Sequence, residues 1–316
     1  MTELKDIKRV YFLGAGGIGM SALARYFNSN GVTVSGYDKT ETALTKKLTE
    51  EGIAIHYEDN IEFIDKGAEL VVYTPAVPKD HKELNYFLQN NYNLVKRSEV
   101  LGSITNDSFN ICVAGTHGKT TTSTMVAHIL RHSGYGCNAF LGGIAVNYDT
   151  NFWSQIPAQS GNSEKNVSVV EADEFDRSFL HLHPDIACVT SMDADHLDIY
   201  GDKSAIEDSF REFADKVSDK TKLFVPKGLP LEGLTVGIND EATYTATNIR
   251  IENSSYVFDV ETPSETIKNI AFGLPGHHNL MNALMALAMA KTFGTPTSDI
   301  ANALASFKGV QRRFSY

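Results

Sequence analysis

Short apolar runs alternate with amphipathic segments through residues 1–100. The runs are typical of buried parallel strands, and between them apolar residues recur at helical spacing. The strands are expected at 10–13, 32–36, 53–55 and 69–73. The helices are expected at 18–30, 41–51 and 82–89. Strands that alternate with helices form βαβ units, so this part of the chain is predicted to fold as an α/β domain with a Rossmann-like parallel sheet.

A polar stretch at 105–108 interrupts this rhythm and predicts a domain boundary, with domains at 1–106 and 107–316. The βα alternation then begins again. Strands are expected at 109–114, 167–171 and 186–190, and helices at 119–133 and 204–217. The second domain is therefore also predicted to be α/β.

The segment 243–272 has a different pattern, because strand-like pieces follow one another without helices between them. These pieces lie at 243–249, 255–260 and 266–272, and helical spacing returns at 279–291 and 298–307. Consecutive strands without crossover helices indicate antiparallel pairing. A small antiparallel sheet attached to the second domain is expected.

Composition narrows the class of protein. The 316 residues carry 39 acidic and 28 basic side chains, a net charge of −11, which argues against a nucleic-acid partner. The 3 cysteines are widely spaced and predict no disulfide framework. We expect no secretory signal, because no apolar region precedes the first charges, and no membrane span, because no apolar run is long enough. We expect a cytoplasmic protein without membrane association.

A first glycine-rich loop follows the strand at 10–13 and opens the helix at 18–30. Its residues fit G-x-G-x-x-G and are Gly14, Ala15, Gly16, Gly17, Ile18 and Gly19. Such a loop lets the backbone and a helix N-terminus approach a pyrophosphate. Asp38, at the end of the second strand, stands where a ribose-binding acid usually lies. The ligand can be NAD, FAD or another nucleotide diphosphate, and a tight turn without ligand is the alternative.

A second glycine-rich loop follows the strand at 109–114 and resembles a shortened Walker A loop. Its residues are Gly115, Thr116, His117, Gly118, Lys119, Thr120 and Thr121. Successive N–H groups in such a loop bind phosphate oxygens. Lys119 is expected to neutralise β- and γ-phosphate charge, and the Thr120 hydroxyl to bind Mg²⁺. This loop predicts a P-loop ATPase-type central domain.

Two acidic clusters, 171–176 and 192–198, follow predicted strands and are candidates for metal binding. Ligands of open α/β sheets bind at the carboxyl ends of the strands, and Mg²⁺ prefers oxygen ligands. Glu171 is the first candidate, and His196 is a candidate for a second ion. The alternative is a solvated acidic surface.

Two groups of histidines have more ordinary interpretations. His181 and His183 form H-x-H but have no third ligand at useful spacing, so surface roles are favoured. Asn279 can cap the helix that carries Asn282. Alternatively, the amides of this segment bind an adenine edge, and the residues alone leave both interpretations open.

With both loops in place, the chain resembles the Mur ligase family of peptidoglycan synthesis. The motifs run in family order along the chain, and the shortened loop is the family's own form. They are FLGAGGIGMSALA at 12–24, TPAV at 74–77, AGTHGKTTT at 114–122, VEADEFDRSFL at 170–180, DADHLD at 193–198, GHHNLMNA at 276–283 and FKGVQRRF at 307–314.

The resemblance implies that the first domain binds the UDP part of a substrate, with the first loop on the diphosphate. The residues near the nucleotide would be Asp38, His56, Thr74, Pro75 and Ala76.

It also implies that the second domain binds ATP and Mg²⁺, with Mn²⁺ as an alternative. Lys119 and Thr121 would hold phosphates, and Arg313 would reach the γ-phosphate. Thr120 and Glu171 would bind one metal ion, and Glu171 with His196 the second. The adenine side would be lined by His278, Asn279 and Asn282. The implied catalytic residues are Lys119, Glu171, His196 and Arg313.

Within the family, the motifs are most similar to the ligase that joins L-alanine to the carboxylate of UDP-N-acetylmuramate with ATP. Family members carry a third, C-terminal domain that binds the amino acid, and this chain ends at Tyr316. We therefore expect a chain that binds nucleotides but does not complete the ligation alone, as a monomer or weak homodimer.

Three other functions remain open at this stage. A recycling ligase that adds a preformed tripeptide to UDP-N-acetylmuramate shares the GTHGKTTT loop at 115–122. A nucleotide-binding module without catalysis would use the same two loops. An NAD-dependent oxidoreductase would use only the first loop and would leave the second loop and the acidic clusters unexplained.

Overall fold

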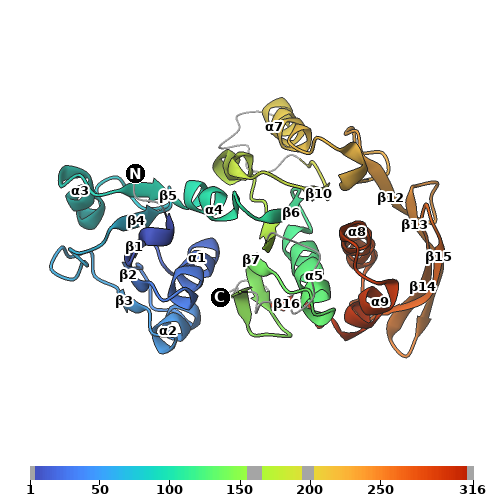
Figure 1. The fold of residues 1–316 in the computed structure, drawn as a ribbon, viewed down its shortest axis with the longest axis horizontal. Helices are drawn as coiled ribbons and strands as arrows, with labels where there is room; N and C mark the ends of the chain where they lie inside the picture. Colours follow the sequence, from blue (N-terminus) through green and yellow to red (C-terminus); the bar gives the residue numbers. More distant parts are fainter. Residues whose placement is uncertain (1–3, 155–165, 194–202, 312–316) are drawn as a thin grey trace. The chain divides into compact units, whose positions relative to one another are not determined.

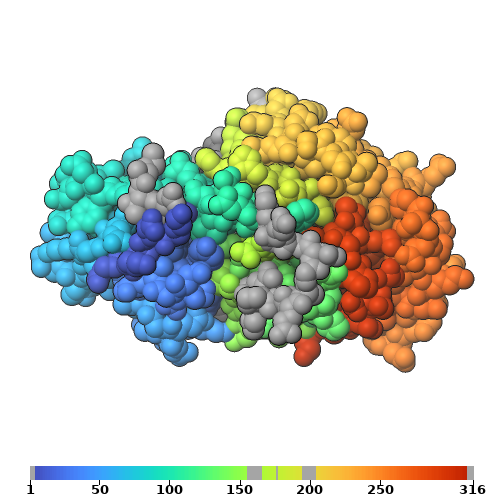
Figure 2. All heavy atoms as spheres, viewed as in Figure 1, coloured from blue at the N-terminus to red at the C-terminus, as the bar shows by residue number. Residues whose placement is uncertain are grey.

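The computed structural model describes residues 4–154, 166–193 and 203–311, and the chain folds as two compact units (Figure 1). The first unit contains residues up to 106 together with the segment 151–154, most of strand β8 (Thr150–Trp153). The second unit contains residues 107–150 and the chain from 155 onward. Figure 2 shows their heavy atoms, with the first unit in blue to cyan and the second mainly in green to red.

The first unit is built on a five-stranded, fully parallel sheet in the order β3-β2-β1-β4-β5. Its strands are β1 (Arg9–Leu13), β2 (Thr33–Tyr37), β3 (Ala54–His56), β4 (Leu70–Tyr73) and β5 (Leu94–Lys96). Its helices are α1 (Ile18–Ser29), α2 (Ala43–Glu50), α3 (Lys82–Gln89) and α4 (Arg97–Thr105), with a 3-10 turn at Leu4–Asp6. The predicted strands and helices of this unit are confirmed, and β5 and α4 are additions.

The strands of this sheet end together. Leu13 is paired with Tyr37 on one side and Tyr73 on the other, Tyr37 with His56, and Tyr73 with Lys96. These five residues are the last of their strands, so the following loops all open at one edge of the sheet. That edge is where open parallel sheets bind ligands.

An apolar core joins α3 to one face of this sheet. Tyr11 and Leu13 of β1 and Val71 of β4 pack in one buried cluster with Leu84 and Phe87 of α3. The rings of Tyr11 and Phe87 lie with centroids 5.1 Å apart. Burying one such aromatic side chain contributes about 2–3 kcal/mol, so this packing fixes the position of α3 over the sheet.

The second unit contains a larger mixed sheet in the order β15-β14-β13-β12-β11-β10-β6-β9-β7-β16. Its strands are β6 (Phe109–Ala114), β7 (Asn138–Ala145), β9 (Val167–Glu171), β10 (Ile186–Val189), β11 (Leu223–Pro226), β12 (Leu234–Ile238), β13 (Tyr244–Glu252), β14 (Ser255–Glu261), β15 (Thr266–Phe272) and β16 (Val310–Gln311). The antiparallel pairing of β13, β14 and β15 is confirmed. These strands continue the main sheet, because β12 and β13 pair in parallel.

The helices of this unit are α5 (Lys119–His132), α7 (Lys203–Asp215), α8 (His277–Phe293) and α9 (Thr297–Ser306), with 3-10 turns at Phe175–His181 and Lys220–Lys222. Helix α8 packs against α5, α9 and strands β10 to β13 (Figure 1). Its residues from 282 to 290 are all buried. A helix that is apolar on every side belongs in the interior of a domain, and α8 packs in the core against the sheet beside α5, which also contacts the sheet. No described helix is long and apolar enough to cross a membrane.

Candidate nucleotide-binding sites

The first glycine loop is held tightly at the end of β1. The amides of Gly14 and Ala15 donate to the Tyr37 carbonyl, at 2.8 and 2.9 Å, and the Gly16 amide donates to Asp38 Oδ2 at 2.7 Å. A Cβ on Gly16 would lie 2.6 Å from Thr45 Cγ2 and 2.8 Å from Asp38 Oδ2. A side chain at this position would have to displace Thr45 or Asp38, so the present loop geometry depends on glycine.

Asp38 braces this loop. Besides the Gly16 amide it accepts from the Thr40 amide, 3.2 Å from Oδ1. The Asp38 carboxylate therefore already accepts the hydrogen bond of the Gly16 amide, which a phosphate oxygen could otherwise accept. Its ribose-binding role stays a prediction.

Residues that follow β4 and β5 also lie at the ligand-binding edge of the first sheet. Thr74 lies beside the loop, because a Cβ on Gly14 would be 3.0 Å from Thr74 Cγ2, and Pro75 and Ala76 continue this turn. Arg97, which sequence reasoning missed, packs against the N-terminal turn of α1: a Cβ on Gly19 would lie 2.7 Å from Arg97 Nη1. Its position directly after β5, in the aligned row of strand ends, is the signal that could have found it.

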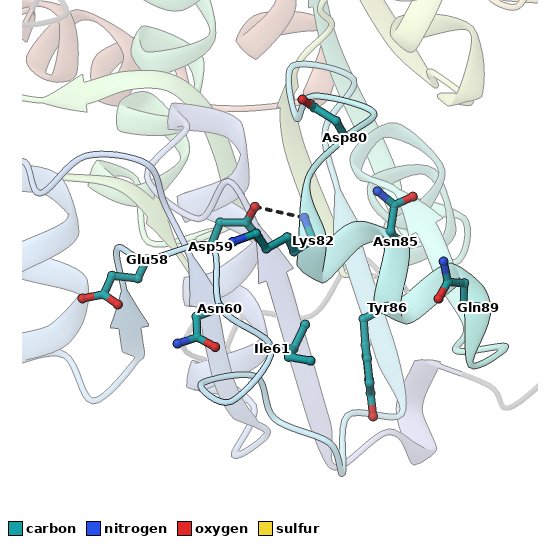
Figure 3. Close-up of a pocket in the computed structure, with 9 residues that line it drawn as sticks. All are labelled: Glu58, Asp59, Asn60, Ile61, Asp80, Lys82, Asn85, Tyr86 and Gln89. Atoms are coloured by element: carbon teal, nitrogen blue, oxygen red, sulfur yellow. Dashed lines mark hydrogen bonds between the residues drawn. The ribbon is translucent and has the colours of Figure 1, made fainter.

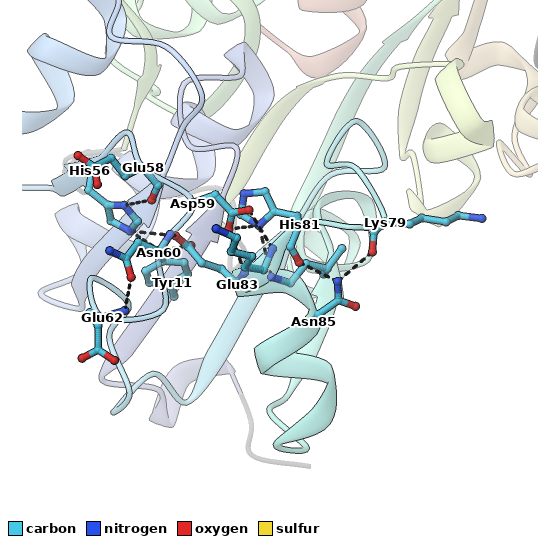
Figure 4. Close-up of polar contacts among 12 residues, drawn as sticks. Tyr11, His56, Glu58, Asp59, Asn60, Glu62, Lys79, His81, Glu83 and Asn85 are labelled. Atoms are coloured by element: carbon cyan, nitrogen blue, oxygen red, sulfur yellow. Dashed lines mark hydrogen bonds and ion pairs between the residues drawn. The ribbon is translucent and has the colours of Figure 1, made fainter.

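His56, the last residue of β3, also lies at this edge. Its Nδ1 is 3.0 Å from the Glu58 carbonyl, and its Nε2 is 2.7 Å from the Tyr11 hydroxyl (Figure 4). An open hollow of about 700 Å³ lies nearby, between segment 58–61 and the exposed face of α3 (Figure 3). Asp59 and Asn60 contribute both to the wall of this hollow and to the polar contacts around Glu83.

The second glycine loop is braced by the segment after β10. The Thr116 amide donates to the Ser191 carbonyl at 3.2 Å, and the His117 amide donates to Ser191 Oγ at 2.9 Å. A Cβ on Gly115 would lie 2.1 Å from Thr190 Oγ1, and the Thr190 hydroxyl donates to the His117 carbonyl. Thr190 and Ser191 were not predicted, although β10 pairs with β6 and ends beside it.

Lys119 opens helix α5, and its ammonium group has three acceptors. It donates to the carbonyls of Gly115 at 2.6 Å and Thr116 at 3.2 Å, and to Glu174 Oε1 at 2.8 Å. The side chains of Lys119 and Glu174 are 13% and 4% exposed. Burial raises the pKa of Glu174, and Lys119 opposes that shift. A phosphate at this loop has to compete with Glu174 for Lys119.

Thr120 and Glu171 lie together, as the predicted metal site requires. The Thr120 hydroxyl donates to Glu171 Oε1 at 3.0 Å, and the Gly142 amide of β7 donates to Glu171 Oε2 at 2.8 Å. A Cβ on Gly142 would lie 2.2 Å from Glu171 Oε1, so glycine makes room for the carboxylate. Burial raises the pKa of Glu171, and Lys119 opposes it. A hydroxyl and a carboxylate fit Mg²⁺ bound mainly by phosphate and water, and the described residues contain no cluster of three ligating side chains.

Two asparagines of α8 were predicted to lie near the nucleotide. Asn282 lies against the phosphate loop, whereas the prediction that Asn279 caps the helix is wrong. A Cβ on Gly118 would lie 2.5 Å from Asn282 Oδ1. Helix α8 begins at His277 with Gly276 as its N-cap, so Asn279 lies in the first turn and donates to the Pro275 carbonyl at 2.7 Å. His278 is exposed there. The adenine-binding roles stay predictions.

Two predicted site residues, His196 and Arg313, lie outside the described residues. Thr121 lies in the first turn of α5, and His117 is exposed, 3.8 Å from Asp193 through its Nε2. His181 and His183 are exposed beyond the acidic segment.

Comparison with known families agrees with this arrangement of a parallel sheet and a mixed sheet, each with a glycine loop after one of its strands. Residues 9–109 match a family described as "Mur ligase family, catalytic domain", and residues 113–290 match the "Mur ligase middle domain". The chain therefore belongs to the Mur ligase family, whose members are ATP-dependent.

Individual relatives narrow the similarity. The UDP-N-acetylmuramate–L-alanine ligase of Flavobacterium psychrophilum is 64% identical over 99% of this chain and 69% of its own length. The solved UDP-N-acetylmuramate–alanine ligase MurC of Thermotoga maritima has a TM-score of 0.85 and 28% identity, covering 97% of this chain and 70% of that one. The UDP-N-acetylmuramate:L-alanyl-gamma-D-glutamyl-meso-diaminopimelate ligase of Neisseria meningitides has the same TM-score with 26% identity, covering 97% and 100%.

Proposed function

We propose that this protein is an ATP-dependent ligase that joins L-alanine to the carboxylate of UDP-N-acetylmuramate. The observation that carries the proposal is the 64% identity with a ligase of that name over 99% of the chain. The two glycine loops, each at the carboxyl edge of its own sheet, support it because the reaction uses two nucleotides. We also propose a cytoplasmic location, and a monomer or weak homodimer.

The first domain, which we place at residues 1–106, binds the UDP-substrate in this proposal. Gly14 to Gly19 approach the diphosphate, and Asp38, His56 and Thr74 to Ala76 surround the nucleotide. Support comes from the aligned strand ends, which bring these residues to one edge. Arg97 adds a cation beside the α1 N-terminus, where negative charge is favoured.

The second unit, residues 107–316, binds ATP. The amides of the α5 N-terminus and Lys119 hold phosphates, and Asn282 lies against Gly118 on the proposed adenine side. Thr120 and Glu171 hold Mg²⁺, which would neutralise phosphate charge and polarise the transferred group. The roles of His196 and Arg313 rest on the family motifs alone.

The chemistry follows from the charge of the reactants, since a carboxylate is a poor electrophile. The substrate carboxylate attacks the γ-phosphorus of ATP, ADP leaves, and an acyl phosphate forms. The amine of L-alanine then attacks the acyl carbon, phosphate leaves, and the amine loses a proton as the amide forms. Lys119 stabilises negative charge in the first step, which is catalysis by positioning and electrostatics.

Calorimetry of the 316-residue chain with UDP-N-acetylmuramate, ATP·Mg²⁺ and NADH tests this assignment. We expect the first two ligands to bind and NADH not to bind. Binding of NADH in competition with UDP-N-acetylmuramate would favour an oxidoreductase and contradict the proposal.

A pair of substitutions in the first loop tests its role. Gly16→Ala places a Cβ against Thr45 and Asp38, and we expect UDP-N-acetylmuramate binding to weaken by about tenfold or more. Gly17→Ala is the comparison within the same loop, because in the free protein its Cβ has no neighbour closer than 3.4 Å, so any loss of binding reports contact with the ligand. Unchanged UDP-N-acetylmuramate binding in both substituted proteins would argue against a diphosphate on this loop.

The tripeptide-adding ligase is the second candidate, because the Neisseria structure matches the fold as well as the Thermotoga structure does. ADP release with L-alanine or with the tripeptide as acceptor separates the two. Release only with the tripeptide would replace L-alanine in the proposal.

A further inference from the structure

Glu83 is a buried carboxylate that the proposed reaction does not use. It lies in the first turn of α3, and its side chain is 0% exposed. No Lys or Arg in the described part of the first unit forms an ion pair with it. A buried carboxylate without a cation needs hydrogen bonds or a proton to compensate for its lost hydration.

A chain of short contacts connects Glu83 to the ligand edge (Figure 4). The Tyr11 hydroxyl lies 2.7 Å from Glu83 Oε2 and 2.7 Å from His56 Nε2. His56 Nδ1 lies 3.0 Å from the Glu58 carbonyl, and the Asn60 amide donates to Glu83 Oε1 at 3.2 Å. The three side chains come from β1, β3 and α3, and only His56 reaches the surface, with 20% of its side chain exposed.

Counting hydrogens restricts the protonation states of this chain. The Glu58 carbonyl can only accept, so His56 Nδ1 must carry a hydrogen. The Tyr11 hydroxyl has one hydrogen and two partners, so one partner must donate to it.

Two arrangements satisfy every contact. In the first, protonated Glu83 donates to Tyr11, and Tyr11 donates to Nε2 of a neutral His56. In the second, Tyr11 donates to ionised Glu83 and accepts from Nε2 of a His56 cation. Both arrangements hold one shared proton between Glu83 and His56, and both have zero net charge.

The surroundings favour the first arrangement. Burial raises the pKa of Glu83 to about 7 and is the main cause of the lowered pKa of His56. The other titratable groups facing the chain are Tyr37 from β2, Glu58 and Asp59 from the segment after β3, Asp65 from the loop before β4, and His81 from the start of α3. Asp59 accepts from the amides of residues 82 and 83 at 3.0 and 3.1 Å, and its negative charge adds to the rise in the pKa of Glu83.

The hydrogen bonds of the two ring nitrogens also determine which part of the His56 ring a ligand can contact. Both ring nitrogens already have hydrogen-bond partners inside the protein, so a ligand is left the carbon atoms and the faces of the ring. Tyr37 and Phe63 flank it, with ring centroids 5.7 and 5.6 Å from that of His56, and Phe63 is 52% exposed. His56 therefore presents a ring surface suited to stacking rather than a hydrogen-bond donor.

We infer that Glu83 and Tyr11 are positioning residues, which hold His56 at the nucleotide edge in its Nδ1–H form by sharing one buried proton with it. The inference rests on the proposed binding of a UDP-sugar by the first unit. When the shared proton leaves at high pH, Tyr11 can donate only to Glu83, and His56 Nε2 loses its partner. The His56 ring is then released, and the affinity for the nucleotide falls.

The first test examines His56 in the ligand-free protein. Nitrogen-15 NMR of histidine side chains, with His56→Gln for assignment, is expected to show a neutral Nδ1–H ring at pH 6.5 that changes state as pH rises to 8.5. In Glu83→Gln the change is expected to disappear, because the amide donates to Tyr11 at every pH. A ring in the Nε2–H form at pH 6.5, or an unchanged titration in Glu83→Gln, would overturn the inference.

The second test measures binding of UDP-N-acetylmuramate between pH 6.5 and 8.5, where its diphosphate does not titrate. The wild-type Kd is expected to rise roughly three- to tenfold with pH, as for one lost hydrogen bond. Glu83→Gln is expected to give a flat profile, and Tyr11→Phe a flat and weaker one. Glu62→Gln removes a nearby exposed carboxylate and is expected to behave as wild type.

The two tests separate this inference from the proposed function. Absence of UDP-N-acetylmuramate binding at every pH, with the expected NMR result, would reject the proposed function and the binding role of the chain. Normal binding with a wild-type pH profile in Glu83→Gln would leave the proposed function intact and reject the role of Glu83.

Discussion

Two glutamates in the described part of the chain, Glu83 in the first unit and Glu174 in the second, are buried beneath a ligand edge and are neutralised in different ways. Glu83 in the first unit has no cationic partner and has a pKa raised to about 7, so a proton neutralises it near neutral pH. Glu174 in the second unit lies 2.8 Å from Lys119, which neutralises it as an ion pair. A proton and a cation are two ways to compensate a buried carboxylate for its lost hydration.

Because the two glutamates are neutralised differently, we expect the first unit to be sensitive to pH and the second to be sensitive to anions. A carboxylate neutralised by a proton makes its unit sensitive to pH. A carboxylate neutralised by the lysine of a phosphate loop makes its unit sensitive to anions, since a triphosphate competes for the same ammonium group. Substitutions at the two positions should therefore have separate effects.

The largest expected effect is that of Lys119→Ala on the second unit. It removes the phosphate-binding cation, and we expect ATP·Mg²⁺ binding to weaken by about 100-fold or more, equivalent to about 2.7 kcal/mol. UDP-N-acetylmuramate binding should remain within about twofold of wild type, because its proposed site lies on the other sheet. Isothermal titration calorimetry measures both.

Lys268→Ala is the control for this substitution, because Lys268 is exposed on β15. It should leave both ligands bound as in wild type. Loss of both ligands in Lys119→Ala would contradict the assignment of two separate sites.

The next effect concerns the stability of the first unit. Glu83 has a folded-state pKa raised from 4.5 to about 7, so its favourable contribution is present below pH 4.5 and is lost as pH rises through 7. The Glu83→Gln protein has no carboxyl group at this position and so does not lose this stability as pH rises. We expect its free energy of unfolding, relative to wild type, to increase by about 1–3 kcal/mol between pH 5 and pH 8. Urea unfolding at both pH values measures the difference.

Two comparisons isolate the cause. His56 has a lowered pKa, so its contribution has the opposite sign; because it shares the buried proton with Glu83, the same measurement on His56→Gln separates the two contributions. Glu62→Gln should show no pH-dependent gain. A Glu83→Gln protein that gains nothing at pH 8 would mean that Glu83 is not protonated in the folded state.

The smallest effect is expected for Glu174→Gln. The amide can still accept from Lys119 but no longer carries charge, so Lys119 is held less strongly and is more available to phosphate. We expect ATP·Mg²⁺ to bind roughly three- to tenfold more tightly, consistent with the strength of charge-assisted hydrogen bonds. Fluorescence titration with a labelled ATP analogue measures this change.

Glu241→Gln, an exposed carboxylate of the same unit, provides the control and should bind ATP as wild type does. Weaker ATP binding in Glu174→Gln would show that Glu174 orients Lys119 for phosphate instead of competing with it.

The local sequence predicted most of the fold where each element carries its own pattern. Helix α3 and strands β6, β9 and β15 begin and end at the predicted residues. Strand β5 and helix α4 were missed, because three residues between polar neighbours carry little periodicity. Segment 151–154 could not be assigned to the first unit, because Asn151 is fixed there by distant groups, donating to the Ile18 carbonyl at 2.6 Å and to Ser21 Oγ at 3.0 Å.

The residues of the candidate sites also fall into those that a local motif predicts and those that only the packing of the chain reveals. Thr120 and Glu171 were predicted as a pair from their motifs, and the structure brings them within 3.0 Å. Gly142, which makes room for Glu171, lies in a strand without a recognisable motif. Glu83 and Glu174 could not be distinguished in sequence from ordinary surface glutamates, because burial depends on what the rest of the chain packs around them.

The sequence by itself determined the two βα-type domains, the two glycine loops and the family, because strand and helix periodicity and loop chemistry are encoded in neighbouring residues. Only the tertiary structure decided that Tyr11, His56 and Glu83 share one hydrogen-bond chain and that Lys119 is held by Glu174. The physical reason is that the strength of a polar contact depends on its partners and on the exclusion of water. Both are set by elements that are distant in the chain and meet only after folding.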